Sequence, residues 1–302
     1  MAPNSKRCNM PAQSEYMLAR IEELVGRRHL TDRRMGYIWM LVPILPILLG
    51  IAVAASIAGI IISSLPQLGT VSGPGGVVPL VAQIIGVYAF AIISVYAILL
   101  IGAIAIYYLL DRRNNHFKRQ QQLYKTLAKY LSTNLTAAPS PNVPKLSQLA
   151  EDSMFEEQDR PAGLWAILYV FVTPITSLIV AYDLTLDMRR HEERQSTYQT
   201  ALTNALAEFG TQPQSLPSPK THKRDALLYL ILTAITAGLF WIYWFYILLK
   251  DYNEHFRDQA LEEDTVLTLL KPRKPSTVCQ ACGGPVPEGS RFCPSCGKPQ
   301  TI

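Results

Sequence analysis

The sequence has no charged side chain between Met35 and Leu110: no lysine, arginine, aspartate or glutamate occurs in this stretch. A soluble domain needs charged residues on its surface, so this absence excludes a soluble fold for this part of the chain. A helix that spans a bilayer needs about 20 apolar residues. The stretch is therefore long enough for two membrane helices, over residues 35–63 and 77–110, joined by a turn at Ser72–Gly76.

Cysteine is also scarce, because the 302 residues contain only five. Four of them form two close pairs, which does not resemble a disulfide framework, and Cys8 is interpreted as an unpaired thiol. Two Cys-x-x-Cys turns with glycine after each pair are typical of a structural zinc site. The sequence predicts one structural Zn²⁺ in a small β zinc ribbon that depends on the metal to fold. Its predicted ligands are Cys279, Cys282, Cys293 and Cys296.

Two later apolar stretches, residues 162–182 and 226–250, each have the length of a membrane segment. The sequence therefore predicts an all-α polytopic membrane protein with four membrane segments and a small C-terminal β zinc ribbon. This pattern divides the chain into five regions. They are a cytoplasmic N-terminal amphipathic helix (1–34), a transmembrane hairpin (35–110), a cytoplasmic helix with a Pro-rich linker (111–161), a repeated pair of membrane segments each followed by an amphipathic helix (162–270), and a linker with the zinc ribbon (271–302).

Basic residues flank the first two predicted membrane segments, whereas the loop between them has no charge. The flanking residues are Arg27, Arg28, Arg33 and Arg34 before the first segment and Arg112, Arg113, Lys118 and Arg119 after the second. Lysine and arginine favour the cytoplasmic side, so we expect a multi-pass cell membrane protein whose N-terminus and zinc ribbon are both cytoplasmic. The same rule explains the net charge of +5 without nucleic acid. The first segment is expected to be an uncleaved anchor.

An internal repeat relates the ends of the later segments. Asp187–Gln195 parallels Asp251–Gln259, and a looser copy, His116–Gln120, follows the second segment. The alignment places Pro174 opposite Gly238. Two interpretations are open: uninterrupted helices that cross the membrane, which we favour as the commoner outcome, or hairpins that bend at these two residues and return, with arms of about ten residues.

Amphipathic helices are predicted before the first segment and after the repeat copies, because apolar residues recur there at helical spacing. These residues are Leu18, Ile21 and Val25 in one helix, Phe117, Tyr124, Leu127 and Leu131 in another, and Tyr198, Leu202, Leu206 and Phe209 in a third.

The fourth segment contains Thr236, Gly238, Leu239 and Phe240, followed by Ile242-Tyr243-Trp244. This pattern resembles the signature of an uncharacterised family of small prokaryotic membrane-protein domains, over about residues 224–256, with a degenerate copy at 162–195. The family often carries a zinc ribbon and has no established activity, so the resemblance implies class and location only. We interpret Trp241, Tyr243, Trp244 and Tyr246 as an interfacial aromatic belt.

The repeat also contains two Asp-x-x-x-His pairs, Asp187/His191 and Asp251/His255. Four-residue spacing places the two side chains on one helical face, which suits a metal or a pH-sensitive pair. The alternative is a polar cap at the membrane end of each repeat. We favour the cap, because Asp111/His116 breaks the spacing and a single pair offers few metal ligands.

No Ser-His-Asp order, Walker motif or His-Glu-x-x-His pattern occurs, and the first two segments contain no ionisable group for an ion pathway. We therefore expect a non-enzymatic integral membrane protein that uses its cytosolic helices and a structural zinc ribbon to dock or organise partner proteins at the membrane. One alternative is a small transporter or channel subunit with the Gly238 and aromatic region lining a path. A membrane metalloenzyme that uses His191 and His255 is a weaker one.

The expected partners are the lipid bilayer and a cytoplasmic protein, with a homo-oligomer left open. Arg291, Phe292 and Lys298 form a small basic and aromatic surface on the tail. Nucleic acid is disfavoured, because phosphate binding needs several more such contacts.

Overall fold

The structure is a computed structural model, and it describes residues 12–65, 77–134, 141–208, 216 and 223–271, with residues 277–279, 281–286, 292–293 and 295–299 of the tail. Helices dominate these residues, as the sequence predicts. The elements are α1 (Ala12–Gly26), α2 (Arg28–Thr31), the 3₁₀ helix η1 (Tyr37–Met40), α3 (Leu41–Ser64), α4 (Val77–Asn134), α5 (Asn142–Glu156), α6 (Ala162–Phe171), α7 (Thr173–Glu208), α8 (Ala226–Ile235), α9 (Phe240–Leu270), β1 (Thr277–Val278) and β2 (Pro285–Val286).

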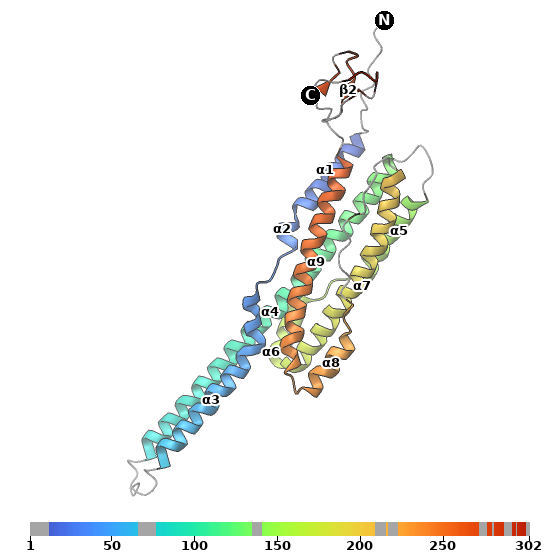
Figure 1. The fold of residues 1–302 in the computed structure, drawn as a ribbon. Helices are drawn as coiled ribbons and strands as arrows, with labels where there is room; N and C mark the ends of the chain where they lie inside the picture. The colour runs from blue at the N-terminus through green and yellow to red at the C-terminus, as the bar shows by residue number, and fades with distance from the viewer. Residues whose placement is uncertain are drawn as a thin grey trace.

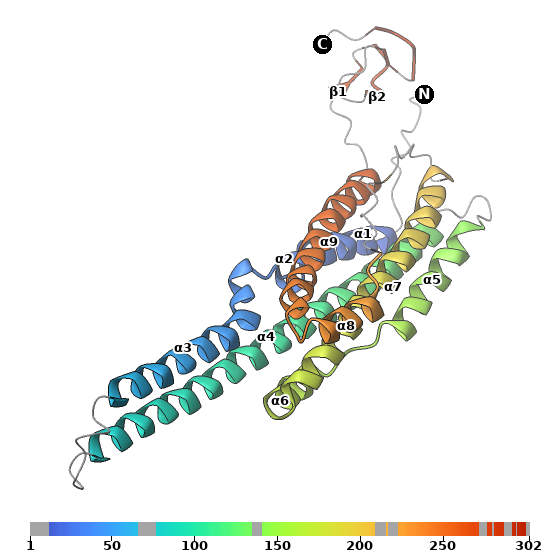
Figure 2. The same cartoon turned by 60° about the horizontal axis from the view of Figure 1, so that its bottom comes forward.

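Helix α3 and the first half of α4 form an antiparallel pair that projects from the rest of the molecule (Figures 1 and 2). Two stretches, Tyr37–Ser64 and Val81–Asn134, are long and apolar enough to cross a membrane. Their apolar side chains face outward: Ile62 is 67% exposed and Ile93 is 69% exposed. These helices are therefore not the buried core of a soluble domain, and their surface needs an apolar environment.

The two later apolar segments do not form uninterrupted helices, so that expectation is wrong. The first is divided at Val172 between α6 and α7, and the second at Thr236–Leu239 between α8 and α9. Pro174 has no backbone N–H to donate, and it occupies the first turn of α7, where none is needed. In the second segment Ala237 and Gly238 have φ angles of 49° and 93°, which end α8. Both segments thus bend where the alternative interpretation placed the bends.

Ion pairs show that each divided segment folds back on itself. Arg160, which precedes α6, contacts Asp183 and Asp187 on α7 at 2.8 and 3.0 Å. Arg224, which precedes α8, contacts Asp251 on α9 at 3.0 Å. Each pair joins the entrance of a hairpin to its exit, so the two ends of each apolar segment lie on the same side.

The part of the chain that the structure describes therefore contains three helical hairpins in which a shorter helix precedes a longer one. They are α3 with α4, α6 with α7, and α8 with α9 (Figure 1). The long helices α4, α7 and α9 run in the same direction and pack as a bundle, with α1 and α5 against it (Figure 2). The repeated polar stretches lie inside these continuous helices and do not interrupt them.

Two apolar cores fill this bundle, and a buried polar layer separates them. Core 1 contains residues of the predicted amphipathic faces, such as Ile21, Leu127 and Leu202. Core 2 lies nearer the hairpin tips and contains Ile106, Leu184 and Trp244 among others. The polar layer consists of buried charged and amide side chains: Arg112, Arg113, His116, Arg119, Gln120, Glu157, Asp187, His191, Glu192, Gln195, Asp251, His255, Gln259, Glu262 and Glu263.

Some predicted boundaries shift. The region 111–161, predicted as a helix with a Pro-rich linker, contains a second helix, because α5 begins at Asn142 and holds Pro144 in its first turn. The aromatic belt is wrong for Trp244, which is fully buried and donates its Nε1–H to Thr185 Oγ1 at 3.0 Å. Phe209 of the third predicted amphipathic helix and residues 272–275 of the linker before the zinc ribbon lie outside the described residues.

A close approach between α4 and α6 provides a test of this packing. A Cβ at Gly102 would overlap the ring of Tyr169, whereas a Cβ at Gly86 would meet open space. We expect Gly102→Leu to lower the free energy of unfolding by about 1–3 kcal/mol through overpacking, and Gly86→Leu to change it little. Thermal unfolding in detergent measures both. Equal stability of the two variants would contradict the contact.

Candidate metal centres

The four cysteines of the tail lie close together, as their spacing predicts. Cys279 Sγ lies 3.7 Å from Cys296 Sγ, and Cys282 Sγ lies 3.6 Å from Cys293 Sγ. A disulfide would need about 2.05 Å. Four thiolates at about 2.3 Å from a tetrahedral ion are about 3.8 Å apart. All four sulfur atoms lie within 4.8 Å of one another, so the group could hold a metal ion.

The two cysteine pairs adopt the same local structure. The amide of Gly283 donates to Cys279 O, and the amide of Gly297 donates to Cys293 O, each at 2.8 Å. Both glycines have positive φ, 70° and 71°, a conformation that a side chain disfavours. The prediction that these glycines let the chain turn tightly is confirmed. One cysteine of each pair, Cys279 and Cys293, is buried and the other is exposed.

Short antiparallel pairings hold the two turns. Thr277 pairs with Val286 through β1 and β2, and Phe292 forms an isolated bridge with Pro299. Phe292 is 62% exposed, and Lys298 is also exposed. Arg291, the other member of the predicted basic and aromatic surface, lies outside the described residues.

A second cluster of candidate ligands lies in the polar layer of the helical bundle. His116 on α4, His191 on α7 and His255 on α9 are 0–2% exposed, and one ring nitrogen from each lies within 4.8 Å of the others. Their ring centroids are 5.0–5.5 Å apart. Phe117 stacks on His191, and Phe256 packs against His116.

Each of these histidines has its Nδ1 atom directed towards a carboxylate from another helix or loop. The nearest carboxylate oxygens are Asp32 Oδ1 at 3.0 Å from His116, Glu157 Oε1 at 2.8 Å from His191, and Glu192 Oε1 at 3.7 Å from His255. The contact of His191 with Glu157 is a hydrogen bond, whereas the Nδ1 atoms of His116 and His255 lie near their carboxylates without forming one. Burial lowers the pKa of His116 to about 3 and also lowers that of His191, so both rings are neutral at pH 7.

The opposite side of each ring has no protein partner. The Nε2 atoms of His116, His191 and His255 are buried and make no hydrogen bond. The same holds for the amide oxygens of Gln120, Gln195 and Gln259, each one helical turn after a histidine. A buried polar atom without a partner costs free energy, so these three imidazole nitrogens and three amide oxygens in one layer require an explanation.

The predicted Asp-x-x-x-His pairs are only partly observed. Asp187 and Asp251 pair with arginines that close the hairpins, which agrees with a polar cap. The histidines instead face Glu157 and Glu192. His116 was not predicted to join His191 and His255, because its five-residue distance from Asp111 breaks the Asp-x-x-x-His spacing. The sequence pattern that all three histidines share is His-x-x-x-Gln, at residues 116–120, 191–195 and 255–259.

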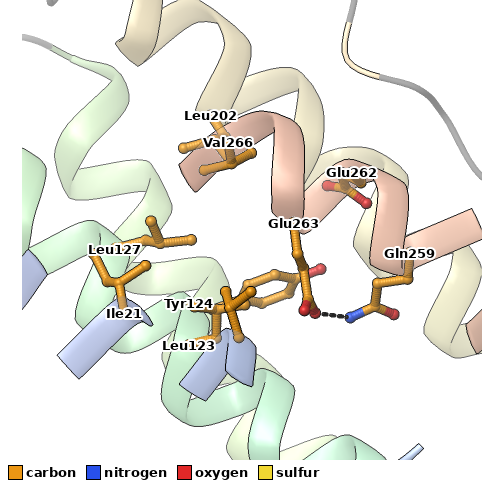
Figure 3. Close-up of a pocket in the computed structure, with 10 residues that line it drawn as sticks. Ile21, Leu123, Tyr124, Leu127, Leu202, Gln259, Glu262, Glu263 and Val266 are labelled. Atoms are coloured by element: carbon orange, nitrogen blue, oxygen red, sulfur yellow. Dashed lines mark hydrogen bonds between the residues drawn. The ribbon is translucent and has the colours of Figure 1, made fainter. Parts of the chain in front are cut away.

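Two acidic residues of this layer, Glu262 and Glu263 on α9, line a cavity of about 10 Å³ that Ile21 and Tyr124 also border (Figure 3). Glu263 accepts hydrogen bonds from Gln259 at 2.8 Å and from Arg119 at 2.9 Å. Glu262 accepts from Gln195 at 2.9 Å. Burial raises the pKa of Glu262 to about 8, since its hydrogen bonds offset the desolvation only in part.

Glu262 makes the stability of the bundle depend on pH. An unfolded glutamate has a pKa of about 4.3, so between that pH and about 8 the folded state binds more protons. The free energy of unfolding therefore falls as pH rises, by at most about 1.4 kcal/mol per pH unit. In Glu262→Gln the amide does not titrate. We expect thermal unfolding between pH 5 and 8 to show the native chain losing stability relative to this variant.

Glu151→Gln on the exposed face of α5 serves as the control, and its unfolding curve should parallel that of the native chain. Parallel curves for native and Glu262→Gln protein would contradict the raised pKa.

No family model matches this chain, and no curated protein or solved structure matches it. The resemblance of residues 224–256 to a membrane-domain family therefore remains a prediction from the motif.

Proposed function

We propose that this protein is a non-catalytic membrane protein that docks or organises a partner protein at the cytoplasmic face of the cell membrane. The observation that supports this best is the arrangement along the chain. An exposed, charge-free helical hairpin projects from a bundle with a polar layer, and a compact four-cysteine group follows the last helix. The charge-free hairpin suits a lipid environment, and the four-cysteine group suits a metal ion.

In this proposal α3 and the first part of α4 cross the bilayer, whereas the α6–α7 and α8–α9 hairpins enter it from one side and return. The depth follows from the contact of Tyr169 with Gly102. Gly102 lies nine residues before Asp111, the first charge after the apolar stretch, which is about 14 Å of helix. The α6 tip thus reaches about half of a hydrocarbon layer of about 30 Å.

The hairpin turns satisfy the backbone groups that such a placement requires. Lipid offers no hydrogen-bond partner, so the amides released at a bend must bond within the protein. At the α8–α9 turn, the amide of Gly238 donates to Thr233 O at 2.8 Å, and the amide of Phe240 donates to Thr236 Oγ1 at 2.9 Å. At the other turn, the amide of Val172 donates to Leu168 O at 2.8 Å.

We assign a single structural Zn²⁺ to Cys279, Cys282, Cys293 and Cys296, in a small β zinc ribbon. The sulfur spacing fits a tetrahedral ion, and an all-cysteine set is typical of structural sites, which leave no open position for substrate. The tail has only a small apolar core, formed by Cys279, Val286 and Cys293, so the ion supplies much of its folding energy. Phe292 is the exposed aromatic residue that suits a protein partner.

The transporter alternative has less support. Gly238 lies at a hairpin tip, where a Cβ would meet no atom within 4 Å. Trp244, from the same signature, is fully packed in core 2. In the described residues, this region therefore does not line a path.

Labelling of a single cysteine distinguishes hairpins from crossings. Ser196 is exposed on α7 and becomes Ser196→Cys in a chain whose five native cysteines are serine. If α6 and α7 form a hairpin, this residue lies on the same side as the end of α4. We expect a membrane-impermeant maleimide to modify it in inverted vesicles and to spare it in right-side-out vesicles.

Two matched positions calibrate the assay. Ser132→Cys near the end of α4 should label like Ser196→Cys, and Ser63→Cys near the far end of α3 should label from the opposite side. If Ser196→Cys follows Ser63→Cys, the segments cross and the proposed placement is wrong.

The docking role predicts that the tail carries partner binding. Crosslinking in intact cells followed by purification should recover a specific partner with the native chain. Replacement of the four tail cysteines by serine should reduce recovery at least tenfold, because the ribbon unfolds without its ion. Phe292→Ala should also weaken capture, by about 1–2 kcal/mol, without loss of tail zinc. Cys8→Ser is the control and should change neither property.

Recovery of the same partner in equal amount after all four replacements would exclude the tail as the docking surface.

A further inference from the structure

The helical repeat brings one histidine from each long helix to the same point. His116, His191 and His255 come from α4, α7 and α9 and are separated by at least 64 residues in sequence. Each is followed one turn later by a buried glutamine. This convergence is a consequence of the repeated architecture, and none of the three side chains takes part in the proposed docking role.

The surroundings of the three rings match those of metal-binding histidines. Such a histidine usually presents one nitrogen to the ion and its other nitrogen to a carboxylate, which orients the ring. Here the Nδ1 atoms face Asp32, Glu157 and Glu192. His191 Nδ1 is hydrogen-bonded to Glu157 at 2.8 Å, whereas the Nδ1 atoms of His116 and His255 and all three Nε2 atoms are buried without a hydrogen bond.

The alternative without a ligand is costly. A buried polar atom that loses its hydrogen bond is destabilising. This layer contains five such imidazole nitrogens, which are both nitrogens of His116, both of His255, and Nε2 of His191. One shared cation would pair with the three Nε2 atoms at once.

We propose that His116, His191 and His255 bind a divalent transition-metal ion through their Nε2 atoms, and that Zn²⁺ suits the site best. Imidazole ligands favour ions of this class over magnesium or calcium. In a tetrahedral zinc site the nitrogens are about 3.3 Å apart. One ring nitrogen of each histidine lies within 4.8 Å of the others, so binding requires a modest approach of the rings around the ion.

The fourth position of this site would be taken by water. A cavity of about 170 Å³ borders His191 and is also lined by Gln120, Gln195 and Arg194. Gln120 and Gln195 each have a free amide oxygen that can accept a hydrogen bond from such a water.

Zinc titration of the full chain tests this proposal separately from the tail. In a chain with all five cysteines replaced by serine, purified in detergent and treated with chelator, we expect one Zn²⁺ per chain by elemental analysis. Binding only to the folded bundle should raise the midpoint of thermal unfolding by about 5 °C or more at saturating zinc. Co²⁺ should give a visible spectrum of nitrogen ligation without thiolate charge transfer.

Matched variants then identify the ligands. His255→Gln removes one ring nitrogen and should abolish stoichiometric binding. Glu157→Gln should weaken binding about 10–100-fold, the usual effect of losing a carboxylate behind a ligand. His29→Gln is the control, because His29 is exposed on α2, and it should bind zinc like the parent.

Three outcomes would overturn the proposal. They are a folded cysteine-free chain that takes up no zinc, binding that survives His255→Gln, and binding that is lost equally in His29→Gln. If His255→Gln does not fold, the titration of the chain with intact histidines still decides. If partner binding proved independent of the tail cysteines, the outcome of this zinc titration would not change.

Discussion

The structure depends on how the three long helices bury the charges at the junction between their apolar and amphipathic halves. These charged side chains are buried, so they must be paired inside the bundle. Arg119 bridges Asp32 at 2.8 Å and Glu263 at 2.9 Å, and Arg113 contacts Asp187 at 3.0 Å. Removal of one partner from such a pair leaves a buried charge and costs about 3–5 kcal/mol. The polar layer therefore fixes the register of the three helices.

The same layer joins repeats that are distant in the chain. Asn253 on α9 accepts from the amide of Met35 at 3.1 Å and donates to its carbonyl at 2.8 Å. Arg112 on α4 donates to Leu248 O on α9 at 3.1 Å. These bonds hold the chain entering η1 and the start of the amphipathic half of α4 against the third hairpin. The projecting α3–α4 pair is thus fixed at its base by polar contacts, and core 2 packs next to them.

The features that the sequence predicts well are local. The charge-free stretch identifies the α3–α4 hairpin, and the cysteine and glycine spacing identifies the two turns of the tail. The partner of a buried charged side chain, in contrast, often lies far away in the sequence. Arg112, Arg113 and Arg119 have the pattern of flanking cations, but the structure buries them. A single sequence does not show whether a cation faces water or a distant carboxylate. The histidine cluster was missed for the same reason, since its three members come from separate helices.

The lengths of α3, α6 and α8 are the reason why we propose that the α3–α4 hairpin crosses the membrane and that the other two hairpins enter and return. Helix α3 has 24 residues, about 36 Å at helical rise, which exceeds a hydrocarbon layer of about 30 Å. Helices α6 and α8 have ten residues each, about 15 Å, and are too short to cross. In the proposed placement, two crossings in total put the polar layer and the tail on one side of the membrane. The histidine cluster and the tail cysteines would then lie on the same side.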